Sequence, residues 1–489
     1  MAETTLVPVD PRRWWALALL CGAFLMVILD GAIVLLALPS IQADLGFSEQ
    51  GLQWVLSAYA ITFAGLLLLG GRAADLLGRR RMFVVGVSFF TIASLVCGLA
   101  WSPAALITAR VVQGVGAAIM TPTALSIIST TFPEGSERNK ALGIWSTMGA
   151  AGATAAWLIG GPLVDGPGWG WIFFINIPLG LAALALSPVL LRESRAEVTR
   201  RSYDPAGALT ITGALVLLVY AVVEAPDVGW SDMQTILSFA GSALLVAAFG
   251  LIESRHRAPL VPLRLLRLRT LVGGNLVMLL FGTIGYGVPF ILTLYAQQVL
   301  GYSAVKFGLG TAVFTVVAAV GSIVSQAVVL KVGFRTVAAT GMVLLAGGAL
   351  ILSQVSVGGT YVNDMLLGLI VYGAGIGPAF VTSTVAALSG VEEHESGLAS
   401  GLSNTAFQIG AALGVAIVTT VAVSSSDDYL AANEDANPLV VLNEGFQSAF
   451  LACVVLAGIG LLLALLLLGR PRQAPQEQFE AVPAPVEND

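Results

Sequence analysis

The sequence predicts an all-α membrane protein in which fourteen transmembrane helices form two six-helix bundles with two inserted helices between them. Of the 489 residues, 57% are hydrophobic and only 11% are charged, and the mean hydropathy is +0.88. These values are typical of a polytopic helical membrane protein and exclude the soluble classes. With fourteen spans, all but two of the 23 Lys and Arg residues fall on one side of the membrane, which indicates the cytoplasm.

The first six apolar stretches predict an N-terminal bundle over 14–190. The first stretch follows Arg12 and Arg13 and lacks a cleavage site, so we interpret it as a retained helix and not as a signal peptide. Each stretch is long enough to cross a bilayer as a helix. The six predicted spans are 14–38, 53–71, 83–101, 104–130, 141–164 and 171–190.

The rest of the chain continues the pattern with two extra spans and a second group of six. The extra spans, 206–224 and 235–252, lie in a polar and basic linker that we place at 191–269. A C-terminal bundle is predicted over 270–468, and the Pro-, Gln- and Glu-rich tail 469–489 is expected to be disordered in the cytoplasm. The last six predicted spans are 271–298, 305–329, 336–355, 364–388, 397–423 and 446–468.

A short, strongly charged turn joins the second and third spans. It places an aspartate and several arginines between two apolar stretches, so it must lie at a water interface. The spacing Gly-x-x-x-Asp-x-x-Gly-Arg-Arg-Arg is more particular than a simple positive-inside loop requires. It resembles the loop between the second and third helices of the major facilitator superfamily, and this resemblance implies a conformational role. The residues concerned are Gly71, Asp75, Gly78, Arg79, Arg80 and Arg81.

Two charged residues fall inside predicted spans, Asp30 in the first and Arg110 in the fourth. Intramembrane charges are costly and are functional candidates by default. Helical rise places Asp30 ~12 Å and Arg110 ~9 Å from the same surface, so they should lie at similar depth, although not necessarily in direct contact. We predict a proton-coupling pair. The alternatives are a protonated Asp30 bonded to a backbone carbonyl and an Arg110 that extends to the outer interface.

Glycines and aromatic residues supply further candidates. Gly160 and Gly161 in the fifth span are assigned a conformational role, although small residues also simply permit close helix packing. The aromatic residues could equally face lipid or neighbouring helices. The predicted substrate-pocket residues are Tyr59, Gln113, Trp157, Phe281, Tyr286 and Phe290. No metal site is expected, because the two histidines and three cysteines form no ligand cluster in the sequence.

Together these motifs resemble the fourteen-helix drug:proton antiporter family of the major facilitator superfamily over residues 14–468. The matching segments carry Leu29-Asp30 with Pro39, the Gly71–Arg81 turn, Arg110 with Gln113-Gly114, and Asn176-Ile177-Pro178. The resemblance implies the major facilitator fold and the export of lipophilic, often cationic compounds in exchange for protons.

Five positions depart from that family's pattern: Ala32, Leu35, Trp157, Gly170 and Phe407. They replace polar or special-backbone residues by apolar or small ones. Trp157 stands where the helix-5 motif of the family has a proline, and Phe407 stands where an arginine is usual. These changes favour a more apolar pocket and neutral or lipid-like cargo.

The predicted function is therefore a proton-coupled multidrug exporter that works by alternating access in the cytoplasmic membrane, with both termini in the cytoplasm. The alternatives are an exporter of an endogenous lipid or secondary metabolite and a non-transporting membrane sensor. No catalytic constellation is visible in the sequence, so we do not expect an enzyme. We expect no cofactor beyond protons as the coupling ion. The expected partners are a lipophilic small-molecule substrate and membrane lipid, without nucleic acid, and the protein is expected to act as a monomer.

Overall fold

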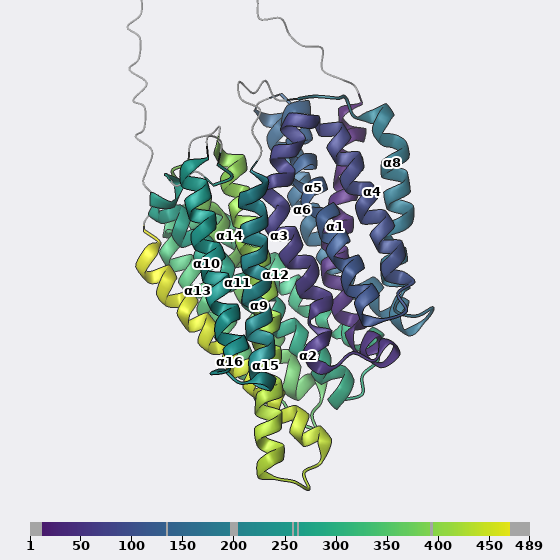
Figure 1. The fold of residues 1–489 in the computed structure, drawn as a ribbon, viewed down its shortest axis with the longest axis vertical. Helices are drawn as coiled ribbons and strands as arrows, with labels where there is room; N and C mark the ends of the chain where they lie inside the picture. Colours follow the sequence, from purple (N-terminus) through teal and green to yellow (C-terminus); the bar gives the residue numbers. More distant parts are fainter. Residues whose placement is uncertain are drawn as a thin grey trace, which may run out of the picture.

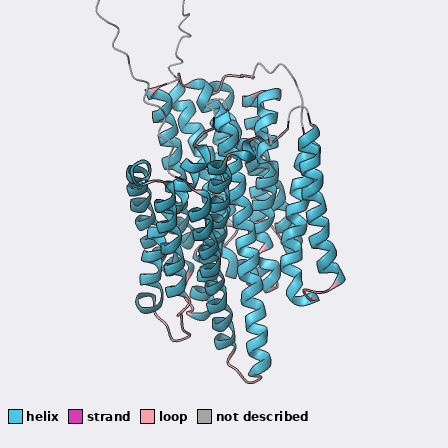
Figure 2. Cartoon of the chain, turned by 90° about the vertical axis from the view of Figure 1, so that its left-hand side faces the viewer, coloured by secondary structure: helices cyan, strands magenta, loops and turns pink. Residues whose placement is uncertain are grey.

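The computed structural model describes residues 12–133, 135–195, 204–256, 259–261, 264–391 and 395–469. Within these ranges the chain is helical, and fourteen helices are long and apolar enough to cross a membrane, which confirms the predicted fold class (Figures 1 and 2). The predicted tail 469–489 lies outside the described residues from 470 onward, as does the segment 196–203 of the linker.

The helices of the first half are α1 (Arg13–Leu45), α2 (Glu49–Leu52), α3 (Trp54–Leu77), α4 (Arg79–Gly98), α5 (Pro103–Thr131), α6 (Ser136–Asp165), α7 (Trp171–Phe174) and α8 (Asn176–Leu190). The two inserted helices are α9 (Pro205–Val228) and α10 (Met233–Arg255). The second half contains α11 (Arg269–Leu294), α12 (Ala304–Val332), α13 (Phe334–Leu352), α14 (Leu367–Leu388), α15 (Ser396–Ala432) and α16 (Pro438–Leu467).

The long helices pack into two groups (Figure 1). The N-terminal group contains α1, α3, α4, α5, α6 and α8, and the C-terminal group contains α11 to α16. Helix α9 packs on α10, α3 and α15, so the inserted pair lies over one line of contact between the groups. Helix α12 packs on α6 along a second line of contact. We call these two lines the α3–α9–α15 seam and the α6–α12 seam.

The same turn recurs at corresponding places in the two groups. Gly78 separates α3 from α4 with φ 114°, and Gly333 separates α12 from α13 with φ 98°. A side chain is disfavoured at such a positive φ, so glycine lets one helix end and the next begin without a loop. The two groups therefore share the same turn geometry between these helices.

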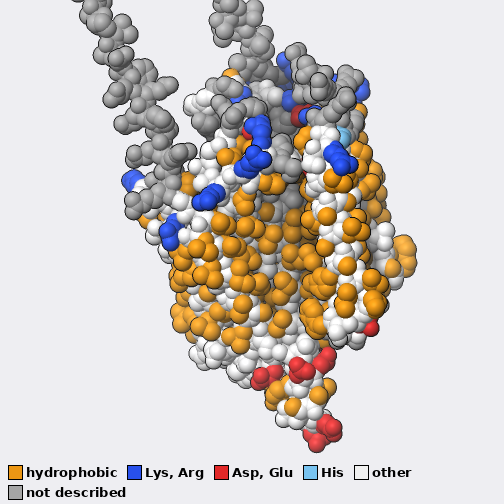
Figure 3. Space-filling model, turned by 60° about the vertical axis from the view of Figure 1, so that its left-hand side comes forward, with side chains coloured by type: hydrophobic (Ala, Val, Ile, Leu, Met, Phe, Trp, Pro, Cys, Tyr) orange, Lys and Arg blue, Asp and Glu red, His pale blue; other side chains and the backbone are white. Residues whose placement is uncertain are grey.

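Charges separate toward the two ends of the molecule. On the face drawn in Figure 3, Lys and Arg side chains gather at one end and Asp and Glu at the other. We call the end that carries Arg79–Arg81 the basic end. The opposite, acidic end carries the exposed residues Asp427, Asp428, Glu434 and Asp435 of the α15–α16 hairpin. This hairpin extends α15 beyond its predicted end at residue 423, because the added residues are polar and project past the apolar belt.

Candidate functional site

A buried ion pair lies in the N-terminal group. The Arg110 guanidinium of α5 donates from Nη1 to Oδ2 of Asp30 on α1 over 2.5 Å, and both side chains are 0% exposed. The sequence predicted that Asp30 and Arg110 lie at similar depth, and the structure places them in direct contact. The two alternatives fail, because Arg110 does not extend to the interface and Asp30 is paired with an arginine and not with a carbonyl.

Neutral donors complete the surroundings of the Asp30 carboxylate. Gln113 Nε2 and Asn176 Nδ2 donate to Oδ1 at 2.8 and 3.0 Å. Gln113 also accepts from Arg110 Nη1 at 2.6 Å and donates to Ser94 at 2.9 Å. Gln113 was predicted to line the substrate pocket, but its polar atoms are engaged by the ion pair here. The carboxylate accepts three hydrogen bonds, which stabilise a charge that hydrocarbon would otherwise disfavour.

Arg110 is held by two further groups of α3. Its Nε donates to the Val55 carbonyl at 2.8 Å, and the Tyr59 ring lies 4.3 Å from the guanidinium carbon. A cation over an aromatic face is attracted by the ring quadrupole. Tyr59 thus contributes to the ion-pair network as well as to the cavity described next. This network holds a charge pair in a dry interior.

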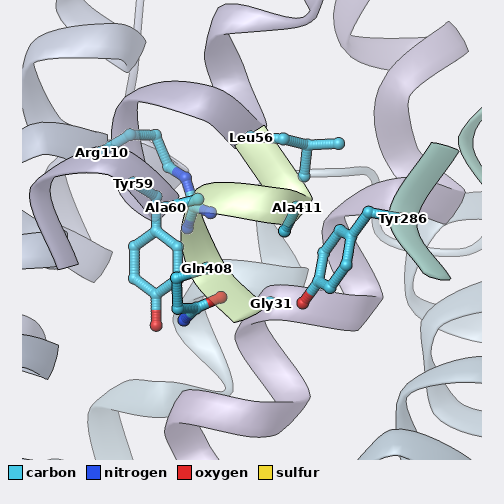
Figure 4. A pocket seen from close by; sticks show the side chains of 8 residues that line it. All are labelled: Gly31, Leu56, Tyr59, Ala60, Arg110, Tyr286, Gln408 and Ala411. Atoms are coloured by element: carbon cyan, nitrogen blue, oxygen red, sulfur yellow. The ribbon is translucent and has the colours of Figure 1, made fainter. Parts of the chain in front are cut away.

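A small cavity of about 10 Å³ lies between the two groups of helices, next to this network (Figure 4). Its size corresponds to about one water molecule. The lining residues are Gly31, Leu56, Tyr59, Ala60 and Arg110 from the N-terminal group and Tyr286, Gln408 and Ala411 from the C-terminal group. Of the predicted pocket residues, Tyr59 and Tyr286 line this cavity.

The other predicted aromatic residues lie deeper in the C-terminal group. Phe281 contacts the rings of Phe407 and Phe380, with centroids 5.8 and 5.7 Å away, and the Tyr286 ring lies 5.9 Å from Phe407. Phe407 stands where the fourteen-helix drug:proton antiporter family usually has an arginine. In this structure it is part of an aromatic cluster. Phe290 is 0% exposed and does not line the cavity. A substrate role for Phe281 and Phe290 stays a prediction.

Trp157 packs across the α6–α12 seam. Its indole is 4% exposed and lies edge-on to Phe307 and Phe314 of α12, at 5.9 and 5.7 Å between centroids. The alternative of a lipid-facing tryptophan is thus wrong. Gly160 and Gly161 allow the neighbouring close contacts, because a Cβ on Gly160 would meet Ile33 of α1 at 2.7 Å and one on Gly161 would meet the α12 backbone at 2.6 Å.

The charged turn at the basic end is joined to the chain after α8. Asp75 accepts from Arg79 Nη2 at 2.9 Å. Arg80 donates its backbone N–H to Glu193 at 3.2 Å, and Arg81 Nε lies 3.6 Å from the same carboxylate. A Cβ on Gly71 would lie 3.4 Å from Pro122 of α5, an ordinary contact. These contacts stay within the N-terminal group, so the predicted role of the turn in conformational change stays a prediction.

Hydrogen bonds join the two groups at the acidic end, and we call them the acidic-end contacts. Gln297 donates to the Leu36 carbonyl at 3.0 Å, and Gln298 donates to Gln42 at 2.9 Å. Asp165, the last residue of α6, accepts the first backbone N–H groups of α12, from Ala304 at 3.1 Å and from Val305 at 2.8 Å. This conformation holds the acidic ends of the groups together.

Several residues of this arrangement were not chosen as site residues from the sequence, among them Asn176, Glu193, Asp165 and Gln408. Asn176 carried a usable signal, because it is a polar residue inside the predicted span 171–190. Asp165 and Gln408 carry none, because their partners belong to the other half of the chain and are fixed only by how the groups meet.

The chain resembles known proteins along most of its length. The model of the Major Facilitator Superfamily matches residues 20–415. The puromycin resistance protein of Streptomyces alboniger is 37% identical over 94% of this chain and 91% of its own length. The cephamycin export protein of Amycolatopsis lactamdurans is 39% identical over 84% of this chain and 85% of its own length. The tetracenomycin C resistance and export protein of Streptomyces glaucescens is 36% identical over 88% of this chain and 79% of its own length.

Solved structures share the fold at low sequence identity. The inward-facing, unoccupied crystal structure of a bacterial homolog of the human lysosomal transporter Spinster has a TM-score of 0.65 and 18% identity, and covers 94% of this chain and 97% of that chain. The human organic anion transporter MFSD10 has a TM-score of 0.59 and 15% identity, and covers 93% of this chain and 100% of that chain.

Proposed function

Because the chain belongs to the Major Facilitator Superfamily of membrane transporters, we propose that it is a proton-coupled exporter of lipophilic small molecules that works by alternating access. It lies in the cell membrane and is a transporter, not an enzyme. The relatives named for resistance to, or export of, puromycin, cephamycin and tetracenomycin C support small organic cargo. The basic end faces the cytoplasm, which places the start of α1 and the end of α16 there, and the protein acts as a monomer.

The observation that carries this proposal is the buried Asp30–Arg110 pair. In the conformation described here, the ionised carboxylate holds Arg110 inside the N-terminal group. Proton uptake by Asp30 removes the negative charge, so the guanidinium loses its strongest partner and the network must rearrange. The rearrangement changes the surface that α1 and α5 present to the cavity between the groups. Rocking of the two groups then exposes the cavity to the other side of the membrane.

Transport in proteoliposomes tests the proposal through Asp30→Asn. With purified protein and an imposed pH gradient, the wild type should accumulate puromycin or tetracenomycin C against its concentration gradient. Asp30→Asn should abolish this accumulation, a loss of at least about tenfold, because an amide cannot carry the proton. The matched variant Asp427→Asn changes an exposed aspartate of the α15–α16 hairpin and should transport normally.

Accumulation by a folded Asp30→Asn variant at the wild-type rate would remove Asp30 as the proton carrier. If the wild type moves no cargo but remains folded, the exporter function fails and the sensor alternative gains support.

A second candidate keeps the scaffold and makes the cargo a secondary metabolite of the producing cell. The names of three relatives favour it: a cephamycin export protein, a tetracenomycin C resistance and export protein and a probable actinorhodin transporter. The apolar residues Trp157 and Phe407, which stand where the drug exporters usually carry Pro and Arg, agree with uncharged cargo. Competition by extracts of the cell's own metabolites in the same proteoliposomes distinguishes this candidate from general drug export.

A further inference from the structure

The Arg110 guanidinium has one nitrogen that no group of the protein satisfies. Nε and Nη1 donate to Val55, Asp30 and Gln113, but Nη2 is buried and has no hydrogen-bond partner. A buried cationic donor without an acceptor is costly, and native structures seldom keep one. The missing partner must be an acceptor, because guanidinium N–H groups only donate.

The guanidinium points into the cavity between the groups (Figure 4). Arg110, whose Nη2 is unsatisfied, is thus one of the residues that border this open volume. The side chains of Leu56, Ala60 and Ala411 are apolar and supply no acceptor. A ligand atom that enters this space contacts apolar side chains except where the polar residues of the cavity lining face it.

The C-terminal group contributes two polar side chains to the same space, Tyr286 of α11 and Gln408 of α15. Figure 4 shows the Tyr286 hydroxyl directed toward Gly31 of α1. The contact is close, because a Cβ on Gly31 would lie 3.1 Å from the hydroxyl oxygen and would make the hydroxyl shift by a few tenths of an ångström. A tyrosine hydroxyl and a glutamine amide can each donate to an oxygen, so both groups of helices contribute donor side chains to the lining of one cavity.

We propose that this cavity is a binding site for one hydrogen-bond-acceptor oxygen of the cargo, a carbonyl, ether or hydroxyl oxygen, held by Arg110 Nη2 from one group and by Tyr286 and Gln408 from the other. The inference rests on the proposed export function. It assigns Gln408 and Tyr286 to cargo selection, and it makes uncharged oxygen-bearing compounds a preferred class.

The size of the cavity fixes what occupies it in each state. About 10 Å³ accommodates a single oxygen atom with its hydrogens and no larger group. A water molecule fills the site when cargo is absent. As the groups separate, the cavity widens and an oxygen of the cargo displaces that water. Because the donors come from both groups, the bound oxygen joins them next to the Asp30–Arg110 pair.

The first test uses two probes that differ in acceptor oxygens. Puromycin carries carbonyl, ether and hydroxyl oxygens, whereas tetraphenylphosphonium is lipophilic and has none. Gln408→Leu and Tyr286→Phe remove the C-terminal donors and leave the ion pair in place. Each should weaken puromycin binding to the purified protein by roughly three- to tenfold and leave tetraphenylphosphonium affinity unchanged.

The control variants make the same substitutions elsewhere. Gln234 and Tyr220 form an exposed hydrogen-bonded pair of 2.8 Å on the inserted helices. Gln234→Leu and Tyr220→Phe should leave both affinities unchanged. Equal weakening of both probes by the cavity variants, or no weakening of puromycin, would overturn the selection of acceptor oxygens.

The second test needs no cargo. A cryo-electron microscopy map of the wild type in lipid nanodiscs, at a resolution that shows ordered water, should contain an oxygen within hydrogen-bond distance of Arg110 Nη2 and Tyr286. A dry cavity would overturn the site. A water in the map together with unchanged puromycin affinity in the variants would mean that the oxygen is water alone, which contradicts the cargo assignment. A wild type that binds neither probe would count against export of such drugs, and the map would still decide whether the oxygen site exists.

Discussion

At the residue scale, the site depends on neutral side chains as much as on the two charges. An ion pair in a dry interior gains stability over separated charges only if its remaining polar atoms are also satisfied. Gln113 and Asn176 meet this need for Asp30. Val55 and Tyr59 meet it only in part for Arg110, because its Nη2 has no hydrogen-bond partner. The pair is therefore held by four residues that carry no charge.

Asn176→Leu tests how far a neutral donor supports the buried ion pair. The variant removes the 3.0 Å hydrogen bond to Asp30 Oδ1. A hydrogen bond to a charged group contributes roughly 1.5–3 kcal/mol, so its loss should destabilise the network by that order. The midpoint of thermal unfolding in detergent should fall, and proton-driven transport should slow.

The measurements are thermal unfolding in detergent and the rate of transport in proteoliposomes. Ser187→Ala is the control, because Ser187 lies on the same helix and its hydroxyl donates to the Ala183 carbonyl, away from Asp30. An Asn176→Leu variant with the unfolding midpoint and transport rate of the wild type would contradict the supporting role of Asn176.

At the element scale, two different seams hold the groups together. The α6–α12 seam joins two helices through Trp157 and Gly161. The α3–α9–α15 seam includes a third helix, α9, which packs on both α3 and α15. Helix α9 contacts the N-terminal group where Thr212 lies against Gly65, and it contacts the C-terminal group where Thr420 donates to the Val222 carbonyl at 3.0 Å. The inserted helix α9 thus packs on both groups at once.

Gly65→Ala should loosen this seam. A Cβ at position 65 would lie 2.1 Å from the Thr212 hydroxyl and 3.1 Å from its Cα, so α9 must move away from α3. Overpacking of this kind typically costs about 1–3 kcal/mol. Thermal unfolding in detergent should show a lower midpoint, and Thr212→Gly should restore part of the loss in the double variant.

The restoration is the decisive comparison, because only residues in contact show a coupling energy in a double-mutant cycle. Gly22→Ala on α1, where a Cβ meets nothing within 4 Å, is the control for glycine replacement itself. If the effects of Gly65→Ala and Thr212→Gly on the unfolding midpoint are additive, α9 does not pack against α3 at this point in the detergent-solubilised protein.

At the scale of the whole molecule, the sequence determined some features and not others for physical reasons. The spans were predictable, because about twenty apolar residues cross a bilayer only as a helix. Asp30 and Arg110 stood out as charges inside spans, but helical rise gives depth and not the side of the helix, so their direct contact was not predictable. The cavity and the acidic-end contacts depend on how two groups meet, and a single sequence carries no periodic signal for that.

The balance between conformations should depend on Asp165. Its carboxylate lies at the start of α12, where two backbone N–H groups and the positive end of the helix dipole favour a negative charge. Opening of the acidic end must break these bonds, because α6 and α12 belong to different groups. Asp165→Ala removes this cap at a cost of about 1 kcal/mol, so the open conformation should gain roughly fivefold in population.

Spin labels at Ala43→Cys and Lys306→Cys, both exposed at the acidic end, would report the distance between the groups. Asp165→Ala should add a longer component to the distance distribution, and Asp165→Asn should add less, because the amide oxygen still accepts. Asp232→Ala is the matched control, since Asp232 accepts from Gln234 within the inserted pair and joins no two groups. If Asp165→Ala and Asp232→Ala give the same distribution as the parent, the contact between Asp165 and α12 does not hold the acidic end closed, and the closure must then rest on Gln297, Gln298 and the packing of Trp157.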